Sequence, residues 1–151
     1  METRSVTDSI ELPHPPKTVF EWLVTPSAIC DWWQASRALV VAEPDGYWMA
    51  AWGTSPDTPD FVTAARLDVY EPPRRLRLGQ TRYTTAAGPL PFPMHMTIEF
   101  SLEAVPSGTR LSVVQAGFPT DPAADPFYQG CVQGWRDTFA SMARFAASQA
   151  G

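Results

Sequence analysis

The most regular alternation of apolar and polar residues in this chain runs from Met94 to Glu103. Its apolar positions are every second residue, namely Met94, Met96, Ile98, Phe100 and Leu102. A period of two predicts a β-strand that buries one face and leaves the other in water. The same period returns in further segments, at residues 37–43, 46–53, 61–71, 74–83 and 109–118. With residues 3–12, which alternate loosely before a proline-rich turn, these segments predict about seven antiparallel strands.

Between the first and second of these strands, the spacing of apolar residues changes to that of a helix. Residues 17–24 read as a short helix that prolines can open, because the first N–H groups of a helix lack partners in any case. This helix ends before Pro26, since the residue before a proline avoids helical angles. Pro26 can in turn open a second short helix, which carries the adjacent pair Trp32 and Trp33.

The last segment also has helical spacing. Its apolar residues recur at intervals of three and four, at Phe127, Cys131, Trp135, Phe139, Met142 and Ala146. This spacing predicts an amphipathic helix of about 25 residues that starts near Pro126. Strands with one apolar face need a cover, and this helix is the only predicted element large enough. We therefore expect one α+β domain over residues 1–151, in which a curved antiparallel sheet wraps around the C-terminal helix.

The adjacent tryptophans raise the question of which way each ring points. Neighbouring helical positions point about 100° apart, so Trp32 and Trp33 cannot occupy the same face. Trp33 lies four residues after Ile29 and continues its apolar stripe, which predicts that Trp33 packs toward the interior and faces the long helix. Trp32 lies three residues after Ile29, on the shoulder of the stripe, which predicts a partly exposed ring at the rim.

Composition and charge exclude several classes of protein. The net charge of −5 argues against a nucleic-acid partner, because phosphates require a basic face. No apolar run approaches the roughly 20 residues of a membrane span, and the N-terminal residues lack the pattern of a signal peptide. We therefore expect a cytoplasmic protein. Its two cysteines, Cys30 and Cys131, lie far apart without metal-ligand spacing, and we expect free thiols with neither a metal nor a cofactor.

Four sequence segments, taken in order, resemble a known family. They are VFEWLVTPSAICDWW at residues 19–33, VYEPPRRLRL at 69–78, GTRLSVVQAGF at 108–118 and QGW at 133–135. Together they are similar to the domain named after the activator homologue of the heat-shock protein 90 ATPase (AHSA1-like), of the SRPBCC, START-like or Bet v 1-like superfamily. The resemblance covers residues 5–148 and implies the helix-grip fold, with two short helices after the first strand and a long C-terminal helix.

This superfamily includes lipid and sterol carriers, plant hormone binders, polyketide cyclases and chaperone activators. The resemblance therefore implies an apolar cavity between the sheet and the long helix more firmly than it implies any reaction. Two positions depart from the family pattern. Gln115 stands where the family often has His or Glu, and Gln80 stands where it often has an aromatic residue. A neutral amide cannot replace the proton transfer of a His or Glu.

The leading hypothesis is a binding protein for an apolar or aromatic small molecule, lipid-like or polyketide-like, held in that cavity. The predicted apolar wall consists of Trp33, Trp48, Ile98, Phe100, Leu111, Val113, Trp135 and Phe139. Gln115 interrupts the apolar face of its strand, and a buried amide must be hydrogen-bonded. Its partner is either another group of the protein or a polar group of the ligand. Gln80 falls on the inward parity of its own strand and has the same two alternatives.

An enzyme of the cyclase, dehydratase or hydrolase kind is the second hypothesis. It requires an acid or a base in the cavity, for which the candidates are His95, Asp31 and Tyr83. No familiar catalytic motif is present in the sequence, so we assign no catalytic residue. Both histidines, His14 and His95, are expected to be solvated or structural.

A protein-interaction module is the third hypothesis, in which the partner is a chaperone or a second copy of the chain. A contiguous exposed apolar patch would favour this hypothesis. The cluster of Arg74, Arg75, Arg77 and Arg82 is expected to lie on a solvated strand face, or to meet an acidic partner or an anionic group of a ligand.

Overall fold

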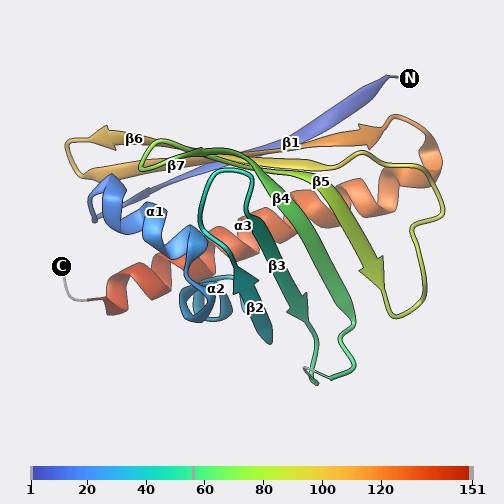
Figure 1. Cartoon of the computed structure of the whole chain (residues 1–151). Coiled ribbons are helices and arrows are strands. Elements are labelled where there is room, and N and C mark those ends of the chain that lie inside the picture. Colours follow the sequence, from blue (N-terminus) through green and yellow to red (C-terminus); the bar gives the residue numbers. More distant parts are fainter. Residues whose placement is uncertain (1, 56, 150–151) are drawn as a thin grey trace.

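The computed structural model of the chain describes residues 2–55 and 57–149. Its elements follow the predicted order of one strand, two short helices, six strands and a long helix, with a 3-10 turn before the last helix (Figure 1). In chain order they are β1 (Thr3–Leu12), α1 (Pro16–Val24), α2 (Pro26–Trp32), β2 (Arg37–Val40), β3 (Tyr47–Trp52), β4 (Phe61–Glu71), β5 (Arg75–Thr85), β6 (Thr97–Val105), β7 (Gly108–Pro119), η1 (Pro122–Ala124) and α3 (Asp125–Ser148). No helix in these two stretches is long and apolar enough to span a membrane.

The strands form one seven-stranded antiparallel sheet in the order β1-β7-β6-β5-β4-β3-β2. Figure 1 shows α3 crossing one face of this sheet, with α1 and α2 beside its C-terminal half. The sheet and α3 enclose a core of apolar side chains, because each contributes only one apolar face. The predicted α+β helix-grip fold is therefore confirmed, including the two short helices after the first strand.

Hydrogen bonds tie both ends of α3 to the start of the chain. Near its beginning, the Tyr128 hydroxyl donates to the Ser5 carbonyl over 2.9 Å. Near its end, the buried His14 ring nitrogen Nε2 lies 2.8 Å from the Ala146 carbonyl. A carbonyl only accepts, so this nitrogen carries the proton. The structural role expected for His14 is confirmed.

A β-bulge in β5 changes which of its side chains face the core. Ala64 of β4 pairs with Arg82, whereas Arg66 pairs with Gly79, so β5 carries one extra residue between these pairs. Gln80 lies in this bulge with a φ of +48° and is exposed. Its predicted inward position is wrong, because the extra residue reverses the alternation after Leu78.

The second short helix has a different phase from the predicted one. Trp32 is fully buried and its indole Nε1 donates to the Trp22 carbonyl over 2.9 Å, whereas the Trp33 ring is only partly buried. The buried stripe of α2 follows the four-residue spacing from Ala28 to Trp32, and Trp33 is the C-terminal cap of the helix. The prediction of a partly exposed Trp32 at the rim is therefore wrong. Trp33 stacks on Trp32 with ring centroids 5.1 Å apart.

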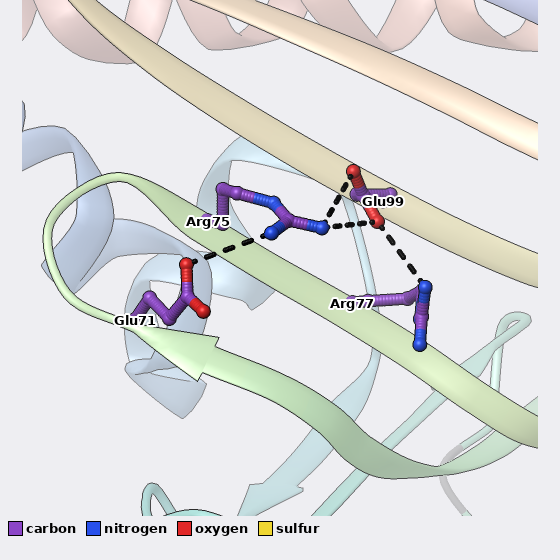
Figure 2. A network of polar contacts seen from close by, with 4 residues as sticks. All are labelled: Glu71, Arg75, Arg77 and Glu99. Carbon is purple, nitrogen blue, oxygen red and sulfur yellow. Dashed lines mark hydrogen bonds and ion pairs between the residues drawn. The ribbon is translucent and has the colours of Figure 1, made fainter.

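Two arginines of the predicted cluster, Arg75 and Arg77, lie on the outer side of the sheet and pair with carboxylates (Figure 2), whereas Arg74 and Arg82 are exposed. Glu99 accepts a hydrogen bond from Arg75 over 3.3 Å and lies 3.7 Å from a guanidinium nitrogen of Arg77. Arg75 also lies 3.6 Å from Glu71. These side chains are partly exposed, so each ion pair contributes only about 0–1 kcal/mol.

Candidate functional site

A cavity of about 310 Å³ lies between the sheet and α3, and we refer to it as the inner cavity. Residues from α2, the sheet and α3 all contribute to its wall. They are Trp33, Trp52, Phe61, Thr63, Tyr83, Met96, Ile98, Gln115, Phe127, Gly130, Cys131, Gly134, Trp135 and Thr138. No charged side chain belongs to this wall as far as the described residues go. The wall is dominated by aromatic rings with a few neutral polar groups, which is typical of sites for small organic molecules.

Two glycines in α3 leave room beside the cavity. Gly130 and Gly134 are four residues apart and therefore share one face of the helix. A Cβ atom added at either position would meet no atom within 4 Å. Glycine inside a helix costs roughly 0.5–1 kcal/mol relative to alanine, and no close backbone approach requires it here. These glycines therefore widen the cavity at the expense of helix stability.

Trp52 in the wall and Trp48 behind it are held through their polar edges. Trp52 donates its indole N–H to the Trp33 carbonyl over 2.9 Å, and Trp48, behind them, donates to the Leu23 carbonyl over 3.1 Å. The Trp33 ring lies 5.5 Å from Trp52 and 5.0 Å from Trp135 between centroids. Because backbone carbonyls satisfy these N–H groups, the rings are oriented without any polar partner in the cavity.

Gln115 is buried in the wall with both ends of its amide occupied. Its oxygen accepts a hydrogen bond from the Trp135 indole over 2.8 Å. Its nitrogen lies 3.2 Å from the Met96 sulfur, which is a weak acceptor. Of the two alternatives given by the sequence, the structure shows hydrogen bonding within the protein, and ligand contact by Gln115 stays a prediction.

The titratable groups of the inner cavity are Tyr83 and Cys131, among the described residues. Burial raises the pKa of the Cys131 thiol to about 12, against a smaller opposing effect of a hydrogen bond from Gln115. Burial, followed by the proximity of Cys131, raises the pKa of Tyr83 to about 12. Both groups are therefore neutral at pH 7. The other two candidates for an acid or base, His95 and Asp31, are exposed and lie outside the wall.

Four of the nine residues predicted for the site come together in the wall, namely Trp33, Ile98, Gln115 and Trp135. Trp33 packs against Trp135, so its predicted orientation toward the long helix is confirmed. The other five lie in the packed core behind the wall and are almost fully buried, namely Trp48, Phe100, Leu111, Val113 and Phe139. Strand alternation and helical spacing correctly predicted that these five residues face the interior, but the cavity does not reach them.

The sequence reasoning did not include several wall residues in the site. Trp52 shares the inner face of β3 with Trp48, so strand parity could have identified it. Gly130, Gly134 and Thr138 recur every four residues beside the predicted apolar stripe of α3. Small residues at that spacing were the available signal for an open helix face. Tyr83, named from the sequence as a candidate acid or base in the cavity, does lie in the wall.

No curated protein sequence matches this chain significantly. Among solved structures, MLL2253 from Mesorhizobium loti is similar with 22% identity and a TM-score of 0.76, over 97% of this chain and 100% of that one. A protein from Rhizobium leguminosarum has 19% identity and a TM-score of 0.78, over 98% and 97% of the two chains.

A third similar structure is DynU16, which is described as a putative protein in the dynemicin biosynthetic locus. It has 18% identity and a TM-score of 0.70, over 95% of this chain and 47% of that one. At these identities the likeness concerns the fold alone. The sequence model for "Activator of Hsp90 ATPase homolog 1-like protein" matches residues 13–147, which is most of the chain. The chain therefore belongs to the family of activator of Hsp90 ATPase homolog 1-like proteins.

Proposed function

We propose that this protein binds an apolar or aromatic small molecule in the inner cavity. The observation that carries the proposal is a cavity of about 310 Å³ walled by fixed aromatic rings and by neutral polar groups. The superfamily to which the chain belongs commonly binds hydrophobic ligands, which supports the same conclusion.

The volume of the inner cavity limits the size of the ligand. Small-molecule sites span about 300–1,000 Å³, so this cavity lies near the lower end. It suits one or two fused rings, which can lie against the indole faces of Trp33, Trp52 and Trp135. Burial of about 200 Å² of apolar ligand surface contributes about 5 kcal/mol before the costs of ordering.

The neutral state of the cavity supports binding over catalysis. An enzyme of the cyclase, dehydratase or hydrolase kind needs a proton donor or acceptor that changes state near neutral pH. Tyr83 and Cys131 both keep their protons far above that range. The described wall therefore favours a site that holds a ligand without exchanging protons with it.

The test uses 2-methylnaphthalene as a ring-sized probe, with its dissociation constant measured by the change in tryptophan fluorescence. We expect saturable binding to the wild-type protein and binding weakened by about thirtyfold in Gly134→Leu, which directs a side chain into open space. The matched control is Ala143→Leu, on the exposed side of the same helix, which should bind the probe normally. Normal binding to Gly134→Leu, or no binding to the wild type, would contradict the proposal.

Protein interaction is a second candidate function, favoured by an apolar patch on the outer face of β2 and β3. Leu39 is 63% exposed and pairs across the strands with the exposed Met49. Tyr47 and Val41 extend the patch, and a shallow hollow of about 140 Å³ lies within it. Leu39→Asp should abolish any self-association seen by analytical ultracentrifugation while leaving the binding of 2-methylnaphthalene unchanged. A monomeric wild-type protein would count against self-association through this face.

A further inference from the structure

The sheet splits between β5 and β6, and the inner cavity borders this split. β5 pairs with β6 only from Arg75 to Leu78, but it continues along β4 as far as Thr85. The bulge at Gln80 lies where the pairing with β6 stops, and bulges bend the strand that carries them. Figure 1 shows the end of β5 diverging from β6 and β7. Beyond the bulge, the described chain pairs with β5 on that side through the bridge between Thr85 and Gly88, where the Gly88 N–H donates to the Thr85 carbonyl over 2.9 Å.

β6 does not fill the split because its chain approaches from another direction. The sequence predicted that this strand starts at Met94, but β6 starts at Thr97. The preceding residues pass close to β7, where a Cβ atom on Gly117 would lie 2.1 Å from the His95 carbonyl oxygen. Gly117 has a φ of +99°, a conformation that glycine adopts readily. The segment before β6 is thus held against β7 and away from the end of β5.

A second cavity of about 300 Å³ occupies the split, and we refer to it as the split pocket. Its wall comes from the unpaired part of β5 and from the loop that leads to β6. The residues are Thr81, Arg82, Tyr83, Thr84, Pro89, Leu90, Phe92, Met94 and Met96. Tyr83 and Met96 belong to the walls of both cavities. These two side chains are therefore what the inner cavity and the split pocket have in common.

The open edge of β5 supplies hydrogen-bonding groups to the split pocket. Ala86 donates its backbone N–H to the Asp60 carbonyl on the β4 side. Backbone groups alternate in direction along an antiparallel strand, so the N–H and C=O of Tyr83 point the other way, toward the split. The Thr81 hydroxyl beside them is buried and has no hydrogen-bond partner among the described residues. A buried polar group without a partner is costly, which marks this edge as incomplete.

Met96 lies between the two cavities and is 4% exposed. Methionine has three rotatable side-chain bonds, and the polar contact of the Met96 sulfur is a weak one of 3.2 Å with the Gln115 nitrogen. Tyr83 is held more firmly, because its ring packs on Phe127 with centroids 5.4 Å apart. A rotation of Met96 is thus the simplest way to let one ligand occupy both cavities.

Building on the proposed function, we propose that the ligand has a second part which passes Met96 into the split pocket and ends in a neutral amide. An amide both donates and accepts, as the exposed N–H and C=O of Tyr83 require. A carboxylate would leave the Tyr83 carbonyl without a donor. The ligand class is therefore a ring system of one or two rings that carries a short chain with a terminal amide.

The test compares three naphthalene probes that share one ring system. 2-Methylnaphthalene occupies the inner cavity alone, 4-(2-naphthyl)butanamide adds the chain with its amide, and 2-pentylnaphthalene adds a chain of the same length without polar atoms. Leu90→Trp fills the split pocket from the loop, and Thr81→Val removes only the unpartnered hydroxyl. Dissociation constants are measured for each probe with the wild-type protein and both variants.

We expect Leu90→Trp to weaken the binding of the butanamide by about tenfold or more, and Thr81→Val to weaken it by about fivefold, as for the loss of one hydrogen bond. Binding of 2-methylnaphthalene should be unchanged in both variants, which also shows that they are folded. Thr81→Val should not weaken the binding of 2-pentylnaphthalene.

The outcomes separate this inference from the proposed function. If 2-methylnaphthalene binds but neither variant weakens the butanamide, the split pocket is not part of the site, and the inner cavity remains one. Tighter binding of 4-(2-naphthyl)butanoate than of the butanamide would overturn the amide in favour of an anionic group near Arg82. If no probe binds the wild-type protein, both the inference and the proposed function are wrong.

Discussion

Replacement of Gly134 offers the most direct way to separate the stability of this protein from its proposed binding function. The residue lies inside α3, where glycine is less favourable than alanine by about 1 kcal/mol. A Cβ atom at this position would meet no other atom within 4 Å. Gly134→Ala should therefore raise the free energy of unfolding by about 1 kcal/mol. For a domain of this size, the melting temperature should rise by about 2–4 °C.

Gly134→Leu should change both the stability of the protein and the free volume of the cavity. Leucine ranks just below alanine in helix propensity, so the variant should also be more stable than the wild type. Its side chain would occupy space that the ligand needs. If it displaces somewhat less than half of the roughly 200 Å² of buried ligand surface, binding weakens by about 2 kcal/mol, or about thirtyfold. Greater stability and weaker binding in one variant is a combination that a misfolded protein cannot produce.

The assay pairs urea unfolding with titration of 2-methylnaphthalene. Ala143→Leu on the exposed side of α3 is the control, and it should change neither quantity by much. A loss of stability in Gly134→Leu would mean that the space beside Gly134 is closed in solution. Unchanged binding in that variant would mean that the probe binds elsewhere. Either result would refute the link that we draw between the glycines of α3 and the cavity.

Three further predictions concern buried polar groups. Trp32→Phe should lower the free energy of unfolding by about 1–3 kcal/mol in urea titrations, because it leaves the buried Trp22 carbonyl without its donor. A change under about 0.5 kcal/mol would indicate that the Trp32 ring is exposed. The pKa values of Cys131 and Tyr83 are raised from 9.0 and 10.0 to about 12, so the unfolded chain releases these protons first as pH rises. The contribution of these two groups to stability should be constant below about pH 8 and be lost as pH rises from about 8 to 12, and Cys131→Ala should make that fall less steep; an equal slope in the variant would contradict the burial of the thiol. Thr81→Val should stabilise the free protein by about 1 kcal/mol in the same assay, because it removes a buried hydroxyl without a hydrogen-bond partner. A destabilised variant would show that the hydroxyl is hydrogen-bonded in solution.

The fold was predictable because its strands and helices differ in period. Alternation in β6 and β7 and the three- and four-residue spacing in α3 specify which faces are buried, and only one helix is long enough to cover the sheet. Two local predictions, the phase of α2 and the inward position of Gln80, were wrong because the period of apolar residues does not reveal their causes. The helix α2 is so short that it buries Ala28, Ile29 and Trp32 together, and Trp33 lies one residue past its end. The bulge in β5 inserts one residue and thereby turns Gln80 outward.

The candidate site was predictable only in part. Parity identifies an inward-facing residue, but it does not say whether that residue meets another side chain or an empty space. Phe100 and Ile98 both face inward on β6, yet Phe100 is covered by Trp33 and Trp135 while Ile98 borders the cavity. Cavity position depends on where small residues of α3 oppose the sheet, and Gly134 shows its effect only when the helix is placed in space.

The pairing of β1 with β7 has a consequence for how this chain folds. Thr3 lies opposite Pro119 and Leu12 lies opposite Thr109. The first strand of the chain therefore cannot form its pairing in the sheet until the last strand is present. Closing so long a loop costs entropy before any contact is gained, which slows folding. During synthesis β1 leaves the ribosome long before its partner, and α3, which completes the cavity, follows later still. The inner cavity is therefore among the last parts of the molecule to form, and a nascent chain lacks this cavity until its final helix docks.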